Sequence, residues 1–204
     1  MINKPFSQAC ENNKQPILTI LTQVFSSKKH VLEIGSGTGQ HAAFFAQHLT
    51  HLTWQTSDLL INHEGINLWL EESKCPNIKS PIVIDLNNVC AATLTNLPIN
   101  GIDGIYTANT LHIVSWPLVV NFFHNIAKHI TSKANVCIYG PFNYQVKCTS
   151  QRNANFDLWL KARDVNSGIR DIEAVLSLAN EVGLKLTDDH EMPANNRLLV
   201  FSKT

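Results

Sequence analysis

Hydrophobic positions along the chain follow two spacings. Short apolar runs such as "HVLEI" at 30–34 have the length of buried strands, whereas "QHAAFFAQHL" at 40–49 carries apolar residues at helical spacing. A helix ahead of the first strand is expected to start near Pro16, because proline suits the first turn of a helix. The pattern predicts helices over 16–25, 40–49, 66–72, 89–94, 117–130 and 171–183, and strands over 30–34, 51–57, 81–85, 104–108, 134–140, 184–192 and 196–203.

The order of these segments predicts an α/β fold. Strands that alternate with helices form parallel β-α-β units and a doubly wound sheet. The last two strands are separated only by "PANN", which is too short for a parallel crossover and requires an antiparallel hairpin. We therefore expect one domain over 1–204, with a mostly parallel, seven-stranded, Rossmann-like sheet and a C-terminal antiparallel hairpin.

Composition excludes several classes of protein. Sixteen basic residues balance sixteen acidic ones, which argues against a general nucleic-acid binder. No apolar run is long enough for a membrane span, and the first residues lack the apolar region of a secretory signal. Five cysteines without a C-x-x-C pair predict reduced thiols in a cytoplasmic protein. Nine histidines without ligand spacing predict no metal site.

The stretch "EIGSGTG" follows the first strand, where ligands of such sheets bind. A phosphate-binding P-loop needs a lysine after its last glycine, but Gln40 follows Gly39. The nicotinamide pattern G-x-G-x-x-G accepts Gly35 and Gly37 but finds Gln40 at its third position. S-adenosylmethionine has no phosphate, and it needs glycines for close backbone approach and carboxylates for its hydroxyl and amino groups.

The pattern E-x-G-x-G-x-G resembles motif I of class I S-adenosylmethionine-dependent methyltransferases. The resemblance implies that Asp58, after the second strand, binds the ribose and that Asp85, after the third, lies near the adenine amine. It also places Asn109 beside the methionine end of the cofactor, and the terminal hairpin is a further mark of that family. The implied cofactor-binding residues are Glu33, Gly35, Ser36, Gly37, Gly39, Asp58, Asp85, Leu86 and Asn109.

A closer resemblance covers nearly the whole chain. Strings such as "ACENNKQPIL", "NANFDLWLKARD" and "PANNRLLVF" look like an uncharacterised methyltransferase-like family that is known as a domain of unknown function. This resemblance implies a fold and S-adenosylmethionine as the cofactor, but it implies no substrate.

Strand direction brings "ANTLHI", "GPFN" and "PANN" to the ligand edge of the sheet. The candidate catalytic residues are therefore His112, Asn143 and Asn196. His112 could act as a base if the acceptor must lose a proton, or it could pack against the cofactor. Asn196, like its neighbour Asn195, could instead serve only the turn.

Two further segments could cover the site. The segment after Tyr144 could form a lid whose arginines, Arg152, Arg163 and Arg170, bind a carboxylate or phosphate, or it could be a solvated surface. The stretch Phe6–Lys14 is expected to precede the first helix and to fold over the cofactor.

These patterns predict a methyltransferase that acts on a small, anionic molecule. "ANTLH" differs from the N-P-P-Y-like motif of enzymes that methylate base amino groups, and no tract combines basic and aromatic residues. We therefore expect no nucleic-acid or membrane partner, and the oligomeric state stays open. The alternatives are a protein methyltransferase and a non-catalytic subunit that binds the cofactor or a partner protein.

Overall fold

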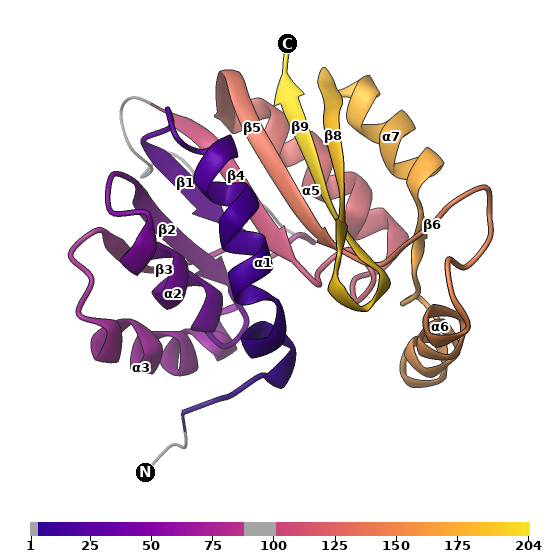
Figure 1. The fold of residues 1–204 in the computed structure, drawn as a ribbon, viewed down its shortest axis with the longest axis horizontal. Helices are drawn as coiled ribbons and strands as arrows, with labels where there is room; N and C mark the ends of the chain where they lie inside the picture. Colours follow the sequence, from indigo (N-terminus) through magenta and orange to yellow (C-terminus); the bar gives the residue numbers. More distant parts are fainter. Residues whose placement is uncertain (1–3, 88–100) are drawn as a thin grey trace.

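The computed structural model describes residues 4–87 and 101–204 (Figure 1). The short helix expected over 89–94 lies outside these residues. A seven-stranded sheet forms the centre of the molecule, in the order β3-β2-β1-β4-β5-β9-β8. Its strands are β1 (His30–Glu33), β2 (Thr53–Asp58), β3 (Ile78–Val83), β4 (Ile102–Ala108), β5 (Ile130–Gly140), β8 (Leu184–Met192) and β9 (Asn196–Lys203).

The pairing of the strands confirms the predicted fold class. β1 pairs parallel with both β2 and β4, β2 with β3, and β4 with β5. β9 runs antiparallel to β5 and to β8, so the last two strands form the expected hairpin and β9 alone is reversed. A second, two-stranded parallel sheet joins β6 (Phe142–Asn143) to β7 (Arg170–Asp171), which the hydrophobic pattern did not predict.

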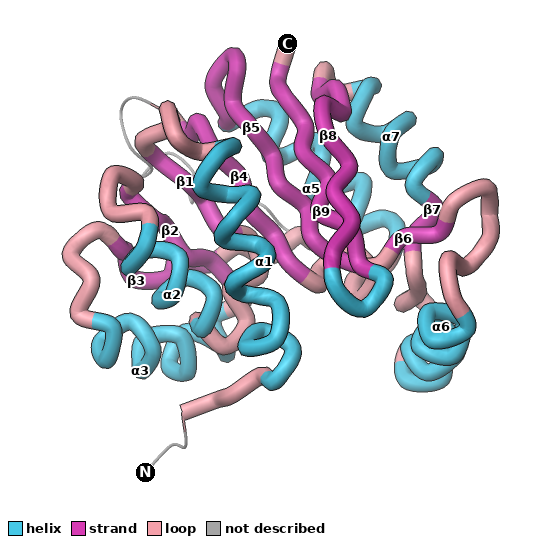
Figure 2. The backbone as a smooth tube through the Cα atoms, in the orientation of Figure 1, coloured by secondary structure: helices cyan, strands magenta, loops and turns pink. Residues whose placement is uncertain are grey.

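Helices cover both faces of the sheet (Figure 1). The α-helices are α1 (Gln8–Val24), α2 (Gln40–His48), α3 (His63–Ser73), α5 (Trp116–His129), α6 (Gln151–Arg163) and α7 (Ile172–Glu181), with short 3-10 turns η1 (Leu60–Asn62) and η2 (Pro193–Asn195). α1 and α2 pack on one face, and α5 and α7 pack on the other. α6 stands away from the main sheet, beyond the β6–β7 pair (Figure 2). None of the helices in the described ranges is both long and apolar enough to cross a membrane.

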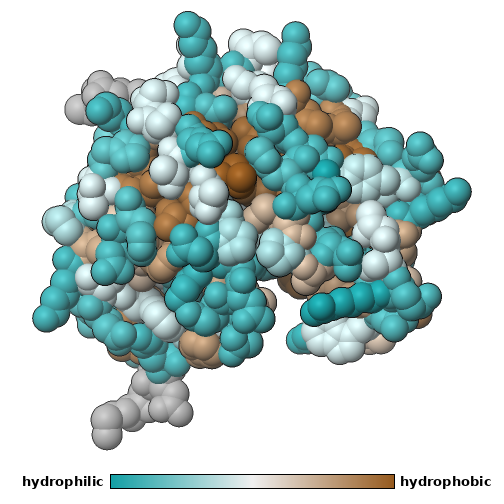
Figure 3. Space-filling view, in the orientation of Figure 1, coloured by the Kyte–Doolittle hydropathy of each residue, from teal (hydrophilic) through white to brown (hydrophobic). Residues whose placement is uncertain are grey.

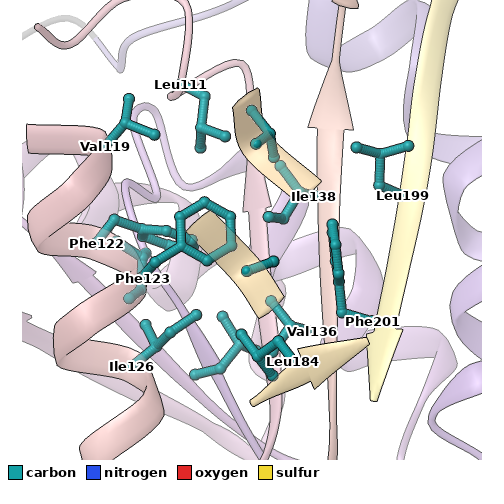
Figure 4. Close-up of a cluster of buried hydrophobic side chains, with 14 of the residues drawn as sticks. Leu111, Val119, Phe122, Phe123, Ile126, Val136, Ile138, Leu184, Leu199 and Phe201 are labelled. Carbon is teal, nitrogen blue, oxygen red and sulfur yellow. The ribbon is translucent and has the colours of Figure 1, made fainter. Parts of the chain in front are cut away.

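Two hydrophobic clusters fill the space between the sheet and its helices. Alternate residues of a strand point to opposite faces, so Ile138 contributes to the cluster under α5 and α7 while its neighbour Tyr139 joins the cluster under α1 and α2. Figure 4 shows the first cluster, where Phe122 and Phe123 of α5 face strand residues that include Ile138 and Phe201. Since both faces are buried, β5 carries a continuous apolar run at 136–139 rather than an alternating pattern.

The structure corrects the expected start of the first helix. α1 begins at Gln8, because the Ser7 side chain accepts a hydrogen bond from the backbone N–H of Cys10 and caps the helix. Pro16 therefore lies inside the helix, where it removes one backbone bond, while buried residues such as Ile17 and Leu21 anchor the helix to the core. The prediction that Phe6–Lys14 precedes the first helix was wrong, since most of this stretch belongs to α1. That the stretch covers a cofactor stays a prediction.

Two other elements differ from the pattern. β3 begins at Ile78 and contains Pro81, which a strand tolerates here because β3 is the edge of the sheet. The helix α6 was not predicted, because it buries polar Asn153 and Asp157 and exposes Leu158. A helix whose buried residues are largely polar shows no apolar stripe of helical period.

Candidate functional site

The glycine turn connects β1 to α2, and the structure shows why each of its three positions suits glycine. All three adopt left-handed backbone angles that other residues rarely take. A Cβ at Gly35 would lie 2.9 Å from Oγ1 of Thr110, and one at Gly39 would lie 3.0 Å from the backbone of Ile66. A Cβ at Gly37 would meet no atom within 4 Å. Gly35 and Gly39 thus permit close packing, whereas Gly37 leaves open space.

Asp58, at the end of β2, braces this turn. One carboxylate oxygen accepts a 2.7 Å hydrogen bond from the N–H of Gly37, and the other accepts bonds from the Leu59 N–H and the Asn62 side-chain amide, both at 2.7 Å. Its predicted contact with a ribose stays a prediction. The structure adds that the same carboxylate holds the loop that would receive the cofactor.

Glu33, at the end of β1, is buried below the turn. Its carboxyl accepts hydrogen bonds from the Ser36 hydroxyl at 2.9 Å and from the Trp54 indole at 3.2 Å. Burial outweighs these two donors and raises the pKa of Glu33 to about 7. This carboxyl therefore changes its charge near neutral pH.

A cleft of about 580 Å³ opens above the turn, and we call it the glycine cleft. It brings together predicted residues from β1, the turn and the loop after β4, together with residues of α1 and α6 that the motifs did not indicate. Its lining is Ser7, Ala9, Cys10, Glu33, Gly35, Ser36, Gly37, Thr38, His41, Ala108, Asn109, Thr110, His112, Ile113, Val114, Phe156 and Trp159.

Asn109 sits where the cleft meets the ends of β4 and β5. It has a left-handed backbone (φ 57°), which asparagine tolerates better than most residues, and its N–H donates to the carbonyl of Tyr139 at 2.9 Å. Asp85 and Leu86 are not among the residues that line the cleft. Asp85 accepts hydrogen bonds from Asn87, and the carbonyl of Leu86 accepts one from Asn121.

A second cavity of about 260 Å³ adjoins the glycine cleft, and we call it the amide chamber. The two cavities share Ala9, Asn109 and Phe156 as lining residues. The surface is hollowed between α1 and α6 in this region (Figure 3). The chamber is lined by Ala9, Asn12, Asn13, Asn109, Tyr139, Pro141, Arg152, Asn153, Phe156, Pro193, Ala194 and Asn196.

The chamber confirms the topological prediction for "PANN". Asn109 follows β4, Pro193 belongs to the turn between β8 and β9, and Asn196 is the first residue of β9, yet all three line one cavity. The turn therefore lies at the ligand edge of the sheet, as the antiparallel hairpin requires.

His112 lies in the glycine cleft rather than in the chamber. Burial and the positive charge of Arg170 lower its pKa to about 4, so the imidazole is neutral at pH 7. Its ring packs edge-on against Phe156, with 5.5 Å between the ring centroids. An imidazole with so low a pKa is a weak base.

The two candidate asparagines have different surroundings. Asn196 lines the chamber, and its amide donates to the carbonyl of Pro193 at 3.1 Å. Asn143 lies on β6 and lines neither cavity. Its amide donates to the carbonyl of Ile169 at 3.4 Å, and its buried Oδ1 has no partner among the described residues. The structure thus brings Asn196, but not Asn143, to the site.

The three candidate arginines of the segment after Tyr144 also lie in different surroundings. Arg152 lines the chamber from α6. Arg163 stacks on the ring of Trp159 at 4.6 Å, outside the chamber. Arg170 donates to the backbone carbonyls of residues 111, 114 and 166, which is a structural role. The segment after Tyr144 therefore brings one guanidinium group to the chamber.

Sequence motifs missed the contributions of α1 and β5. Asn12 and Asn13 of α1 and Tyr139 of β5 line the chamber, although no motif distinguished them. Two signals covered both asparagines: the family-like string "ACENNKQPIL" and the expectation that Phe6–Lys14 folds over the cofactor. In the part of the chain that the structure describes, no group of three His, Cys, Asp or Glu side chains could hold a metal ion.

The chain matches one family model and many solved structures. The model of a family described as "Protein of unknown function (DUF938)" matches residues 4–203. An O-methyltransferase family protein from Burkholderia thailandensis superposes with a TM-score of 0.80 at 14% identity, covering 94% of this chain and 56% of that protein. An O-methyltransferase family 2 protein from Planctomyces limnophilus DSM 3776, in complex with apigenin, gives 0.78 at 14% identity, with coverages of 96% and 58%.

A third structure, PigF with SAH, superposes with a TM-score of 0.73 at 16% identity, covering 93% of this chain and 61% of PigF. At these identities the likeness concerns the fold. The chain spans little more than half the length of the proteins that it matches.

Proposed function

The chain belongs to the family described as "Protein of unknown function (DUF938)", and from this premise we propose that it is an S-adenosylmethionine-dependent methyltransferase acting on a small, anionic molecule. One observation carries the proposal: the glycine cleft adjoins the amide chamber, and Asn109 and Phe156 line both cavities. Such a pair of cavities suits a reaction between a bound cofactor and a second molecule. The O-methyltransferase structures that share the fold support the same assignment.

The residues of the glycine cleft fit this cofactor. Its volume of about 580 Å³ is in the range of small-molecule sites. Gly37 leaves open space for close approach, and Glu33 can pair with an ammonium group, since a neighbouring cation favours the ionised carboxylate. When bound, the cofactor supplies a methyl group on a positively charged sulfur atom.

The amide chamber supports a small acceptor. Its volume of about 260 Å³ falls below the usual range for drug-sized ligands. Arg152 is the one charged side chain among its described lining residues, and no carboxylate lines it. A guanidinium group binds carboxylate or phosphate in a bidentate manner, so the chamber favours an anionic acceptor.

The surrounding residues indicate catalysis by positioning. His112 is neutral and weakly basic at pH 7, and Asn196 and Asn109 present amides. Holding two reactants in the correct geometry is itself a large contribution to rate. We therefore propose that Asn196 positions the acceptor and that His112, packed against Phe156 in the glycine cleft, excludes water there. Asn143 has no role in this scheme.

Isothermal titration calorimetry with S-adenosylhomocysteine tests the cofactor assignment, and NADH is the control ligand. Binding of S-adenosylhomocysteine without binding of NADH is the expected result. The opposite pair of results would refute the assignment.

Transfer of labelled methyl groups to a panel of small organic acids tests the acceptor class. Arg152→Gln should raise KM for an active acid while leaving the affinity for S-adenosylhomocysteine unchanged. Arg163→Gln is the matched control, because Arg163 lies on the same helix but outside the chamber. Equal effects of the two substitutions would argue against a charge-binding role of Arg152.

A second candidate function is a non-catalytic subunit that binds the cofactor and a protein partner. It is favoured by Ile113 and Trp159, which line the glycine cleft and are 49% and 50% exposed. Cofactor binding without methyl transfer to any small acid would favour it. For the catalytic proposal we expect a small-molecule partner, no nucleic-acid or membrane partner and a cytoplasmic location, as the composition predicts.

A further inference from the structure

Tyr139 is the one hydroxyl-bearing side chain among the described residues of the amide chamber. It lies on β5, and its ring packs in the hydrophobic cluster with Tyr106 and Leu198. Its carbonyl accepts the hydrogen bond that holds Asn109 at the junction of the two cavities. Tyr139 thus faces the space that we assign to the acceptor.

A chain of buried polar groups leads to its hydroxyl. The Tyr106 hydroxyl lies 3.2 Å from Nδ1 of His41, and Nε2 of His41 lies 2.7 Å from Oδ1 of Asn13. Asn13 and Tyr139 line the amide chamber together, and the Asn13 side chain lowers the pKa of the Tyr139 hydroxyl. Tyr106, His41 and Asn13 come from β4, α2 and α1, and none is more than 5% exposed.

Burial decides the direction of the hydrogen bonds in this chain. Burial lowers the pKa of His41 to about 4, so its neutral ring carries one N–H at pH 7. If Nδ1 carried the hydrogen, it would donate to Tyr106, and the buried O–H of Tyr106 would have no acceptor in the described structure. An unsatisfied buried donor is unfavourable, so Tyr106 donates to Nδ1 and the hydrogen of His41 resides on Nε2.

The remaining directions follow. His41 donates to the Asn13 carbonyl oxygen, so the NH₂ group is the part of the Asn13 amide that remains for Tyr139, which lines the chamber with it. The side chains of Asn13 and Asn196 both favour negative charge on the Tyr139 oxygen, as amide donors do. Burial nevertheless raises the pKa of Tyr139, so the hydroxyl keeps its hydrogen and donates it.

We propose that Tyr139 is a specificity-determining residue of the amide chamber, whose O–H donates a hydrogen bond to a carboxylate or carbonyl oxygen of the acceptor. The chain Tyr106–His41–Asn13 positions it as a donor. This inference rests on the proposed function, because it takes the chamber to be the acceptor site. It narrows the acceptor class to molecules that present an oxygen acceptor to Tyr139.

The tautomer of His41 tests the direction of the hydrogen bonds from Tyr106 to Asn13, and this test needs no methyl acceptor. Long-range ¹H–¹⁵N spectra at pH 7 should show hydrogen on Nε2. The His41 signals can be assigned through contacts to the stacked ring of Phe45, whose centroid lies 5.1 Å away. Hydrogen on Nδ1 would reverse every bond, direct the Tyr139 O–H at Asn13 and overturn the proposal.

Binding of acetate, benzoate and 4-hydroxybenzoate tests the donor role, with S-adenosylhomocysteine present in saturating amounts. Tyr139→Phe should weaken the tightest of these acids by about tenfold or more, because a hydrogen bond to a charged group is lost. Its affinity for S-adenosylhomocysteine should not change. Tyr144→Phe is the matched control, since that hydroxyl donates to Asp189 and lies outside the chamber.

Equal affinities of wild type and Tyr139→Phe for the acids, or no binding of any of the three to wild type, would overturn the donor role. The titration with S-adenosylhomocysteine separates the two proposals. Failure of that titration refutes the cofactor assignment, whereas failure with the acids alone refutes only the role of Tyr139.

Discussion

Two single substitutions, Gly37→Ala and its control Gly183→Ala, test whether the glycine cleft holds the cofactor. Gly37 lines the cleft with φ 57°, and Gly183 follows α7 with φ 76° and lines neither cavity. Alanine in the left-handed region costs about 1–2 kcal/mol at either position. Neither Cβ would collide with the protein, because Gly37 has no atom within 4 Å and the nearest atom to Gly183, on Lys203, is at 3.4 Å.

The two substitutions should therefore destabilise the fold alike and differ only in binding. For a chain of this size we expect each melting temperature to fall by about 2–8 °C, measured by differential scanning fluorimetry. Gly37→Ala should also weaken S-adenosylhomocysteine binding by about tenfold or more, or 1.4 kcal/mol, because its methyl group enters space that the cofactor needs. Gly183→Ala should bind as wild type does.

Two results would refute this reasoning. If Gly37→Ala binds S-adenosylhomocysteine as tightly as wild type, the turn does not contact the cofactor. If both variants lose binding equally, the loss reflects stability rather than the site.

Three further predictions concern the frame of the site. The folded-state pKa of Glu33, about 7, exceeds its ordinary value of 4.5. Between pH 4.5 and pH 7 the folded chain therefore keeps a proton that the unfolded chain has lost. Its free energy of unfolding should fall by about 3 kcal/mol as the pH rises through this range. Glu33→Gln should abolish that fall in urea titrations, and an unchanged pH slope would contradict the assignment. Asp58→Ala should lower the free energy of unfolding by about 1.5–3 kcal/mol and weaken S-adenosylhomocysteine binding, whereas Asn62→Ala should have a much smaller effect on both. Equal losses for the two variants in calorimetry would show that Asp58 does not brace the turn. Arg170→Gln should lower stability by about 1.5–3 kcal/mol through its lost bonds to backbone carbonyls, and a melting temperature equal to that of wild type would disprove this structural role.

Local patterns were sufficient for the mostly parallel sheet with its C-terminal hairpin and for the glycine turn. Strand and helix periods depend on neighbouring residues, and a loop as short as "PANN" permits only an antiparallel connection. The same pattern failed for α6, because two of the three residues that this helix buries, Asn153 and Asp157, are polar. It also misplaced the start of α1, where the cap at Ser7 prevailed over the preference of Pro16 for a first turn.

The sequence by itself determined the fold class and the backbone chemistry of the glycine turn, because both depend on residues close together in the chain. Only the tertiary structure decided that Asn196 faces the amide chamber and Asn143 does not, and that Arg152 alone among the three candidate arginines lines it. It also brought Tyr139 of β5 and Asn13 of α1 into the lining of the same chamber. The physical reason is that the burial and hydrogen-bond partners of a side chain are set by segments far apart in sequence, which no local pattern records.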